Sequence, residues 1–374
     1  MHSVKLNYTL NHRDDTNTAG DAGLVRHPLM ALLQAVAQHG SISAAARDLG
    51  LSYRHVWGEL KRWEDVMGHE LIVWEKGQSA KLSEFGTKLM WAERQTQARL
   101  APQIEALRAD LERTFAVAFD PDAHVLTLYA SHDDALPRLR EQAASTGLHL
   151  DMRFCGSVDA IRALNEGRCT LAGFHTQSPP GIHAQQSYQH LLKPGLHKII
   201  GFATRTQGLM VAPGNPLQLQ SLVDVARTQA RFVQRSQGTG TRVLLDDLLQ
   251  QAQLKPQDLA STADPEPSHT ALAEAIASGR GDVGLGLESS ARARGLGFVP
   301  LIREHFHLVC LKSALDTPAT QALRLVLQTP EWLSQLNALA GYQSNHSGEV
   351  QSLRTLLPWW AFKRAKKSGA KTAG

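Results

Sequence analysis

Residues 40–72 read GSISAAARDLGLSYRHVWGELKRWEDVMGHELI, and they determine the fold expected at the start of the chain. Either Ser41 or Ser43 can cap a short helix that runs to Leu49, because a serine hydroxyl accepts a hydrogen bond from the free amides of a first helical turn. The Ala-rich face of this helix lets another helix pack closely against it. Gly50 then permits the sharp turn that ends the helix.

A second helix follows the turn, with Ser52 as its cap and an end near Val66. Its Val56, Leu60 and Trp63 are spaced as one buried face, which leaves the start of the helix free. Two such helices are typical of a helix-turn-helix, in which the second helix contacts base edges in the major groove of DNA. The predicted DNA-contacting residues are Ser41, Ser43, Ser52, Tyr53, Arg54, His55, Lys76 and Lys81.

The segment after the second helix contains two strand-like pieces around Gly77, which predict a hairpin wing whose lysines contact phosphates. Residues 24–83 would then form a winged helix-turn-helix. Residues 84–115 have the pattern of one long helix, either a core helix or a dimerisation helix. We favour dimerisation, because a helix-turn-helix usually reads two half-sites and the apolar positions repeat as in a coiled coil. These positions are Leu100, Ile104, Leu107 and Leu111.

The composition, 374 residues with 43% hydrophobic and 20% charged side chains, indicates a globular protein of two or three domains. We expect residues 1–23 to be disordered and residues 351–374 to form a basic tail, which accounts for part of the formal charge of +4. Residues 24–113 contain 12 Lys or Arg and 11 Asp or Glu, so the DNA prediction depends on the motif. Neither a membrane span nor a secretion signal is recognisable, which predicts a cytoplasmic protein.

Metal or disulfide chemistry is not expected from the cysteines and histidines. Cys155, Cys169 and Cys310 lack the spacing of a zinc site and are interpreted as buried thiols. His305 and His307 have no third ligand beside them. We therefore predict no metal and no cofactor.

From residue 124 to residue 350, short apolar runs such as VLTLYA, LHLDMRF and DVGLGL alternate with helical patterns, which predicts an α/β domain with a largely parallel sheet. A weak sequence repeat relates residues 159–174 to residues 271–286. The pattern of each copy predicts a helix, a turn at a glycine and a buried strand. The repeat suggests two lobes with a cleft between them. The predicted lobes are residues 124–204 with 305–350, and residues 205–304.

A glycine loop lies within RFVQRSQGTGTRVLLDDLLQQ, residues 231–251. A dinucleotide fingerprint would need glycine at Val243, and no Gly-Lys-Ser/Thr follows for a phosphate-binding loop of nucleotide hydrolases. The loop either binds another anion with its amides, hydroxyls and guanidinium at a helix start, or uses its glycines for packing alone. The predicted anion loop consists of Gly238, Thr239, Gly240, Thr241 and Arg242.

Other polar residues follow predicted strands or begin predicted helices, where they are either helix caps or ligand contacts. Ligands of open α/β sheets bind at the carboxyl ends of the strands, so these residues could line one cleft. They are Ser131, His132, Gly156, Ser157, His175 and Ser268.

Two resemblances follow from these motifs. Residues 28–112 resemble the winged helix-turn-helix of LysR-type regulators, and LSYRHVW followed by AKLSEFG is most similar to the ModE-type, molybdenum-responsive branch. Residues 124–350 resemble the two-lobed, type II periplasmic-binding-protein-like domain, through ASHDDAL, GSVDAIRALNEGRCTLAGFH and RFVQRSQGTGTRVLLD among others. The resemblance implies that Ser131, Ser157, His175 and the loop 239–242 line the cleft between the lobes.

Together, the motifs and resemblances predict a dimeric or tetrameric transcription regulator that binds double-stranded operator DNA. They imply a small oxyanion effector, namely molybdate, tungstate, a molybdenum-cofactor species or formate, and control of molybdenum, tungsten or formate dehydrogenase related genes. An enzyme or a cofactor carrier is the alternative, with Asp133, Asp134 or Glu288 as acid or base. We assign no catalytic residue, because neither a G-x-S-x-G motif nor a nucleotide loop is present.

Overall fold

The computed structural model describes residues 27–73, 80–119 and 124–360. The expected N-terminal segment 1–23, Lys76 of the wing and the lysine-rich end of the chain lie outside these residues. Within them, no helix combines the length and the apolar character that a bilayer crossing requires.

The N-terminal domain is a winged helix-turn-helix. Three helices, α1 (Pro28–His39), α2 (Ile42–Asp48) and α3 (Tyr53–Met67), pack around one apolar core, and β1 (Ile72–Val73) pairs antiparallel with β2 (Lys81–Leu82). Ser41 caps α2 and Ser52 caps α3 through their side-chain oxygens. Gly50 between these helices has a φ of 65°, a left-handed conformation that favours glycine.

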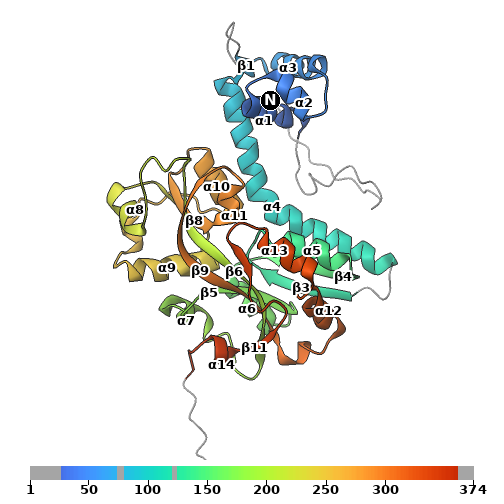
Figure 1. Cartoon of the computed structure of the whole chain (residues 1–374), viewed down its shortest axis with the longest axis vertical. Helices are drawn as coiled ribbons and strands as arrows, with labels where there is room; N and C mark the ends of the chain where they lie inside the picture. The colour runs from blue at the N-terminus through green and yellow to red at the C-terminus, as the bar shows by residue number, and fades with distance from the viewer. Residues whose placement is uncertain (1–26, 74–79, 120–123, 361–374) are drawn as a thin grey trace, which may run out of the picture.

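A single long helix, α4 (Glu84–Phe119), connects this domain to the rest of the chain. It contains Pro102, and Figure 1 shows that it changes direction partway along. Proline explains such a kink, because it removes one backbone hydrogen bond and its ring crowds the preceding turn. The part of α4 beyond the bend runs along the sheet of the second domain.

The second domain contains one sheet with the strand order β4-β3-β5-β9-β6-β8-β7, and β10 and β11 pair with β6. The pairs β3–β4, β3–β5 and β7–β8 are parallel, whereas β5–β9, β6–β8 and β6–β9 are antiparallel. The expectation of a largely parallel sheet was therefore wrong. The strands are β3 (His124–Ala130), β4 (Leu148–Phe154), β5 (Leu171–Gln177), β6 (His197–Val211), β7 (Phe232–Val233), β8 (Val283–Leu287), β9 (Gly297–Leu311), β10 (Tyr342–Ser344) and β11 (Val350–Ser352).

The antiparallel pairs arise because two long strands cross the whole domain. The 15-residue strands β6 and β9 pair from His197 opposite Leu311 to Val211 opposite Gly297. Helices cover both faces: α5 (Leu136–Ala144), α6 (Ser157–Asn165), α7 (Ile182–Tyr188), α8 (Leu222–Thr228), α9 (Gly240–Gln251), α10 (His269–Ala277), α11 (Glu288–Arg292), α12 (Pro318–Val326), α13 (Pro330–Asn337) and α14 (Leu353–Leu356).

Separate apolar cores form on either side of the crossing. One group of buried residues surrounds β3, β4 and β5, and another surrounds β7, β8 and the helices α8 to α10. We refer to the first part, with α5, α6, α12 and α13, as lobe I, and to the second, with α8 to α11, as lobe II. Strands β6 and β9 are shared by the two lobes.

The folded part of the chain extends beyond residue 351, where the basic tail was expected to begin. Ser352 caps α14, and Leu353, Leu357 and Trp359 are buried in a core of lobe I. Cys155 differs from expectation as well, because it is only half-buried, whereas Cys169 and Cys310 are buried.

Candidate functional site

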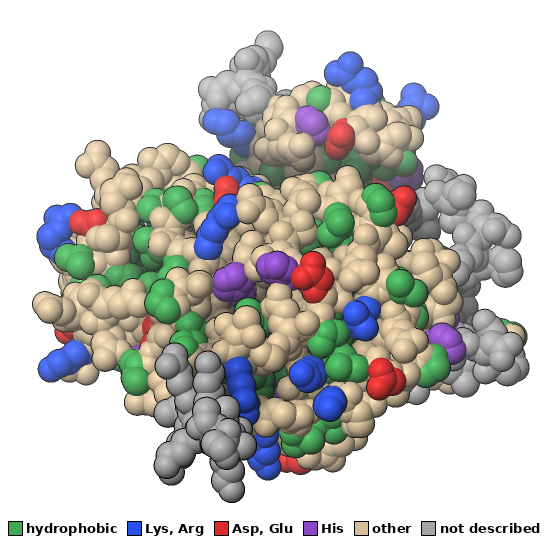
Figure 2. Space-filling model, turned by 60° about the horizontal axis from the view of Figure 1, so that its bottom comes forward, with side chains coloured by type: hydrophobic (Ala, Val, Ile, Leu, Met, Phe, Trp, Pro, Cys, Tyr) green, Lys and Arg blue, Asp and Glu red, His purple; other side chains and the backbone are tan. Residues whose placement is uncertain are grey.

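The first turn of α3 is exposed and polar. Ser52, Tyr53, Arg54 and His55 are all solvent-exposed, while Val56 behind them is fully buried. Such an arrangement suits a recognition helix, because base contacts come from the first residues of that helix. Figure 2 shows Lys and Arg side chains at the outer edge of the small domain that stands off the main body.

The other predicted DNA contacts differ in position. Ser43 is exposed on α2, whereas Ser41 is partly buried as the cap of that helix. Lys81 is exposed on β2, and Lys76 lies outside the described residues. The structure thus presents Ser43 and Lys81, but not Ser41, as readily accessible groups.

A buried carboxylate fixes the wing to the recognition helix. Glu64 near the end of α3 accepts hydrogen bonds from the amides of Leu71, at 2.8 Å, and Ile72, at 3.2 Å, and from Lys61 Nζ, at 2.6 Å. Burial alone would raise the pKa of Glu64, but these hydrogen bonds lower it, so the carboxylate stays charged. Glu64 therefore ties the end of α3 to the start of β1.

Several predicted ligand residues converge where the lobes meet. Ser157 Oγ lies 3.4 Å from Nδ1 of the buried His175, on the neighbouring strand β5. A Cβ added to Gly240, at the start of α9, would lie 2.8 Å from His175 Nδ1, and one added to Gly156 would lie 2.5 Å from the carbonyl oxygen of Gly238. Glycine is therefore required at both positions, since any side chain would collide with the opposite lobe.

The same cluster continues around α9. Thr241 Oγ1 lies 3.3 Å from His269 Nε2 and accepts a hydrogen bond from Gln207 Nε2, also at 3.3 Å. Gln207 and Arg205 both donate to Glu304 Oε1, at 2.5 and 2.6 Å. These side chains are buried, so the crossing of β6 and β9 carries a polar network inside the protein.

Arg235 is a second buried cation of this cluster, beside Arg205, and the sequence pattern did not single it out. Its side chain follows β7 directly and is 4% exposed, and neither Nε nor Nη1 has a hydrogen-bond partner among the described residues. Burial, with a smaller effect of Arg205, lowers the pKa of Arg235 to about 9, so the guanidinium is charged at neutral pH. The rule that ligands bind at the carboxyl ends of strands could have identified it.

The histidines around Arg235 also have free ring nitrogens. His132 Nδ1, His175 Nε2 and His269 Nδ1 are buried and lack a hydrogen-bond partner within the part of the chain that is described. Burial lowers the pKa of His175 and of His269 well below the usual value, and the nearby Arg205 and Arg235 lower both further. Buried polar groups normally find partners, so these ring nitrogens and the Arg235 guanidinium leave hydrogen-bonding capacity unused inside the protein.

Two residues of the predicted site make other contacts. Arg242 donates from Nη1 to Gln234, and its Nε lies 3.6 Å from Asp246 Oδ1 within lobe II without a hydrogen-bond partner among the described residues. Thr239 caps α9 by accepting from the amide of Arg242. Sequence position placed Arg242 near the loop, but only the fold determined its partners.

The remaining predicted ligand residues lie at the edge of the cluster. Ser131 is buried, and the ring of His132 packs against Phe154 at 5.0 Å between centroids. Ser268 is fully buried as the cap of α10, and its hydroxyl also donates to the carbonyl of Ala98 in α4, at 3.4 Å.

The candidate acids and bases are all engaged in contacts. Asp133 pairs with Arg205 and accepts from Tyr342, and Glu288 pairs with Arg292. Asp134 accepts hydrogen bonds from the hydroxyls of two serines in α11. Structural roles therefore account for these three carboxylates.

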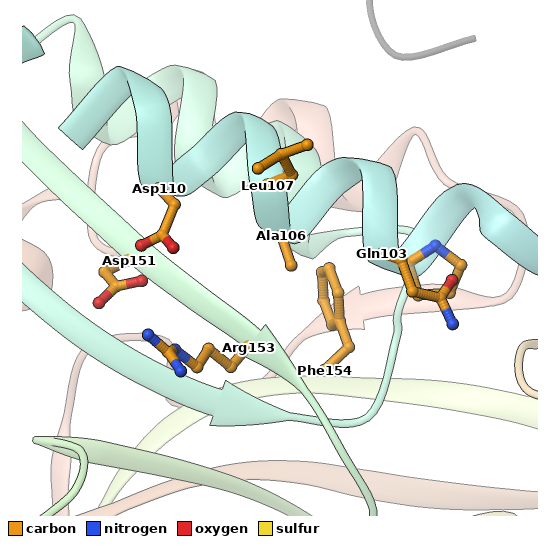
Figure 3. A pocket seen from close by; sticks show the side chains of 8 residues that line it. Gln103, Ala106, Leu107, Asp110, Asp151, Arg153 and Phe154 are labelled. Atoms are coloured by element: carbon orange, nitrogen blue, oxygen red, sulfur yellow. The ribbon is translucent and has the colours of Figure 1, made fainter. Parts of the chain in front are cut away.

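A surface pocket of about 270 Å³ lies between α4 and β4. Figure 3 shows Asp110 of α4 beside Asp151 and Arg153 of β4, with Leu107 on the outer side of the helix. None of its lining residues belongs to the buried cluster between the lobes.

A winged helix-turn-helix joined to a two-lobed domain with a buried polar cluster where the lobes meet defines the class of DNA-binding regulators with a ligand-binding domain. Two family models match the chain. The bacterial regulatory helix-turn-helix protein, lysR family, matches residues 28–87, and the PBP superfamily domain matches residues 139–328. The chain belongs to the PBP superfamily, and with its lysR-family domain it is a LysR-type DNA-binding transcriptional regulator with a PBP-like ligand-binding domain.

The chain is similar to two curated proteins and to several solved structures. An "Uncharacterized protein YvgK" of Bacillus subtilis (strain 168) is 26% identical over 233 residues, which cover 62% of this chain and 75% of that protein. An H2O2-bound mutant of Corynebacterium glutamicum OxyR aligns with a TM-score of 0.44 and 16% identity, over 83% of this chain and 94% of that chain. CbnR, a LysR family transcriptional regulator, aligns with a TM-score of 0.41 and 16% identity, over 80% and 99%.

Proposed function

We propose that this regulator senses a small oxyanion, which binds between the lobes and brings them together. The observation that carries the proposal is Arg235, a buried guanidinium whose Nε and Nη1 have no hydrogen-bond partner in the described structure. Glu266 and Asp134 partly offset the charge of Arg235, but its unused donors are buried, and a bound anion would pair with them. Charge-assisted hydrogen bonds from arginine to oxyanions are among the strongest in proteins.

The surrounding groups favour an oxyanion over a larger organic acid. Ser157, His175 and the amides at the start of α9 are donors placed around one point, and the glycines there bring backbone from both lobes close together. The nearby carboxylates of Asp133 and Glu304 both pair with Arg205, whose single positive charge offsets one of their two negative charges. The Arg235 guanidinium adds a second positive charge to the cluster. Molybdate and tungstate are our leading ligands, and formate or a molybdenum-cofactor species is the rival.

The DNA side of the proposal is a dimer, or a pair of dimers, that reads two half-sites in the cytoplasm. Leu100 and Leu107 on α4 are 38% and 59% exposed, and an apolar seam of this kind is stabilised when a second copy covers it. Closure of the lobes affects DNA binding only if the ligand prefers the closed form. Control of molybdenum, tungsten or formate dehydrogenase genes is the regulatory role that such a ligand would serve.

The test is a thermal-shift and calorimetric titration of the full chain with molybdate, tungstate, sulfate, phosphate and formate. We expect one oxyanion to stabilise the protein in proportion to its concentration, since a ligand of the native state acts by mass action. Arg235→Gln should abolish the effect. Arg242→Ala is the matched control, because its guanidinium contacts Gln234 and Asp246, and it should respond as the wild type. No response to any anion would refute the proposal. A normal response of the Arg235→Gln variant would show that the anion does not bind at Arg235.

A further inference from the structure

The first half of α4 is attached to lobe II. Arg94 Nε lies 2.8 Å from Glu274 Oε1 of α10, and Arg99 donates to both carboxylate oxygens of Glu266, at 3.0 and 2.9 Å. Both glutamates are buried, so these ion pairs are shielded from water at their acidic ends. The half of the helix that carries the DNA-binding domain is thus held by the lobe that contains Arg235.

The second half of α4 is attached to lobe I. Glu105 forms an ion pair with Arg140 of α5, and both side chains are nearly buried. This half also packs along β4, where it lines the pocket of Figure 3 with residues from Gln103 to Asp110. The exposed Leu107 lies on the same half, so the predicted dimer seam extends over lobe I.

Pro102 separates the two halves, and a residue of lobe II stabilises the break. Proline has no amide hydrogen, so the carbonyl of Ala98 lacks its usual helical partner. Ser268 Oγ donates to this carbonyl at 3.4 Å, and it accepts from the amide of Ala271 at 3.0 Å as the cap of α10. The bend of α4 seen in Figure 1 therefore has a specific contact from the ligand-binding domain.

The segment 266–269 connects that contact to the cluster between the lobes. The backbone of Glu266 bridges to that of Arg235, and the amide of Glu266 donates to the carbonyl of Gln234 at 2.8 Å. His269, next to Ser268, contacts Thr241. This segment thus contacts the linker helix through Glu266 and Ser268, and the candidate ligand site through Glu266 and His269.

From this arrangement we infer that α4 flexes at Pro102 when the lobes close, so that the DNA-binding domain moves with lobe II and the part of the dimer seam beyond Pro102, from Ile104 to Leu111, moves with lobe I. Lobe closure then changes the position of each recognition helix relative to the dimer axis. Arg99, Glu266 and Ser268 are the positioning residues, because their contacts hold the first half of α4 against lobe II. We call this set of contacts the strap. The inference rests on the proposed function only for the ligand that drives closure.

The test measures three distances by pulsed electron spin resonance, with spin labels on exposed cysteines that replace Arg62 in α3, Val223 in lobe II and Leu325 in lobe I. Cys155 is replaced by serine, since it is the only one of the described cysteines that is not buried. Labelled chains are diluted with unlabelled protein so that each distance lies within one chain.

Closure is perturbed in two independent ways. One is saturation with sodium molybdate. The other is Asp134→Ala, which removes the hydrogen bonds that the hydroxyls of Ser289, at 2.5 Å, and Ser290, at 2.8 Å, donate from lobe II to lobe I. The second perturbation needs no ligand.

We expect the 223–325 and 62–325 distances to shift together, while the 62–223 distance stays constant. A shift of 223–325 without a shift of 62–325 would overturn the inference, as would three constant distances under both perturbations. If calorimetry detects no molybdate binding but Asp134→Ala gives the expected shifts, the proposed ligand fails and the strap stands.

A matched pair of variants tests the strap directly. Arg99→Ala should broaden the 62–223 distance, because it releases α4 from Glu266. Arg280→Ala removes the other arginine that pairs with Glu266, at 2.8 Å, without touching α4, so it should leave that distance narrow. Equal behaviour of the two variants would show that Arg99 does not hold the helix.

Discussion

Arg205 and Glu304 face each other across the two long strands that join the lobes, with Arg205 Nε 2.6 Å from Glu304 Oε1 and each side chain 1% exposed. The same guanidinium contacts Asp133, which also accepts from the hydroxyl of Tyr342 at 2.7 Å. One buried cation thus holds carboxylates from two segments at the crossing.

Replacing Arg205 by Met should reduce the free energy of unfolding by about 3–5 kcal/mol, because Asp133 and Glu304 would be left as uncompensated buried charges. Urea denaturation measures the change. Arg231→Met is the control, since its ion pair with Asp282 lies at the surface and should contribute less than about 1 kcal/mol. Equal losses of unfolding free energy in the two variants would show that burial does not make the Arg205 ion pairs more important than the surface pair.

Arg235→Gln should have opposite effects on ligand binding and on the ligand-free protein. Oxyanion affinity should fall at least about tenfold, which corresponds to about 1.4 kcal/mol. The melting temperature without ligand should not fall, because the substitution removes a buried charge whose Nε and Nη1 are unpaired. A large loss of ligand-free stability would show that Arg235 is a structural residue.

Arg54→Ala should reduce operator discrimination by about 1–3 kcal/mol if this exposed residue of the first turn of α3 reads a base. Competition of operator and random duplexes in a fluorescence assay measures it at fixed salt. Arg62→Ala, near the other end of the same helix and paired with Glu59, should leave discrimination unchanged. Unchanged discrimination in the Arg54 variant would show that Arg54 does not read a base.

Leu107→Asp should dissociate the oligomer, because it places a charge in the exposed apolar seam of α4. Sedimentation velocity of the full chain gives the oligomeric state. Leu325→Asp is the matched control, since Leu325 on α12 is 67% exposed but does not belong to the seam. A Leu107→Asp protein with unchanged mass would exclude this seam as the interface.

The stability of the protein should fall as the pH drops below about 6.5. Burial lowers the pKa of His175 and of His269 well below the usual value, and that of His307 to about 3. The unfolded chain therefore binds protons that the native chain excludes. Above about pH 6.5 both states are neutral at these rings, and below it the unfolded state gains stability as it takes up protons.

Each such histidine contributes at most about 1.4 kcal/mol per pH unit. Urea midpoints between about pH 7 and about pH 5 should reveal the slope, and His307→Gln should reduce it. A slope that is identical in the variant would mean that His307 is not excluded from protonation in the native state.

The DNA-binding domain was predictable because its structure depends on neighbouring residues. Ser41 and Ser52 accept hydrogen bonds from amides three positions away, and Gly50 supplies the left-handed turn between them. The convergence of Ser157, His175 and Gly240 was also anticipated, from the rule for strand ends together with a family resemblance. Such features need only the local pattern and a general rule of topology.

Other features depended on contacts between distant parts of the chain. Ser268 meets Ala98 across 170 positions, and Arg99 meets Glu266 across 167, so no local pattern could reveal that α4 is strapped to lobe II. The fold also determined that Arg242 has Gln234 and Asp246 beside its guanidinium, whereas Nε and Nη1 of Arg235 have no hydrogen-bond partner among the described residues. The sequence alone determined the helices, strands and turns, since these follow from short-range hydrogen bonding and periodicity. Only the tertiary structure decided which charges are paired, because pairing depends on the burial and neighbours that the complete fold creates.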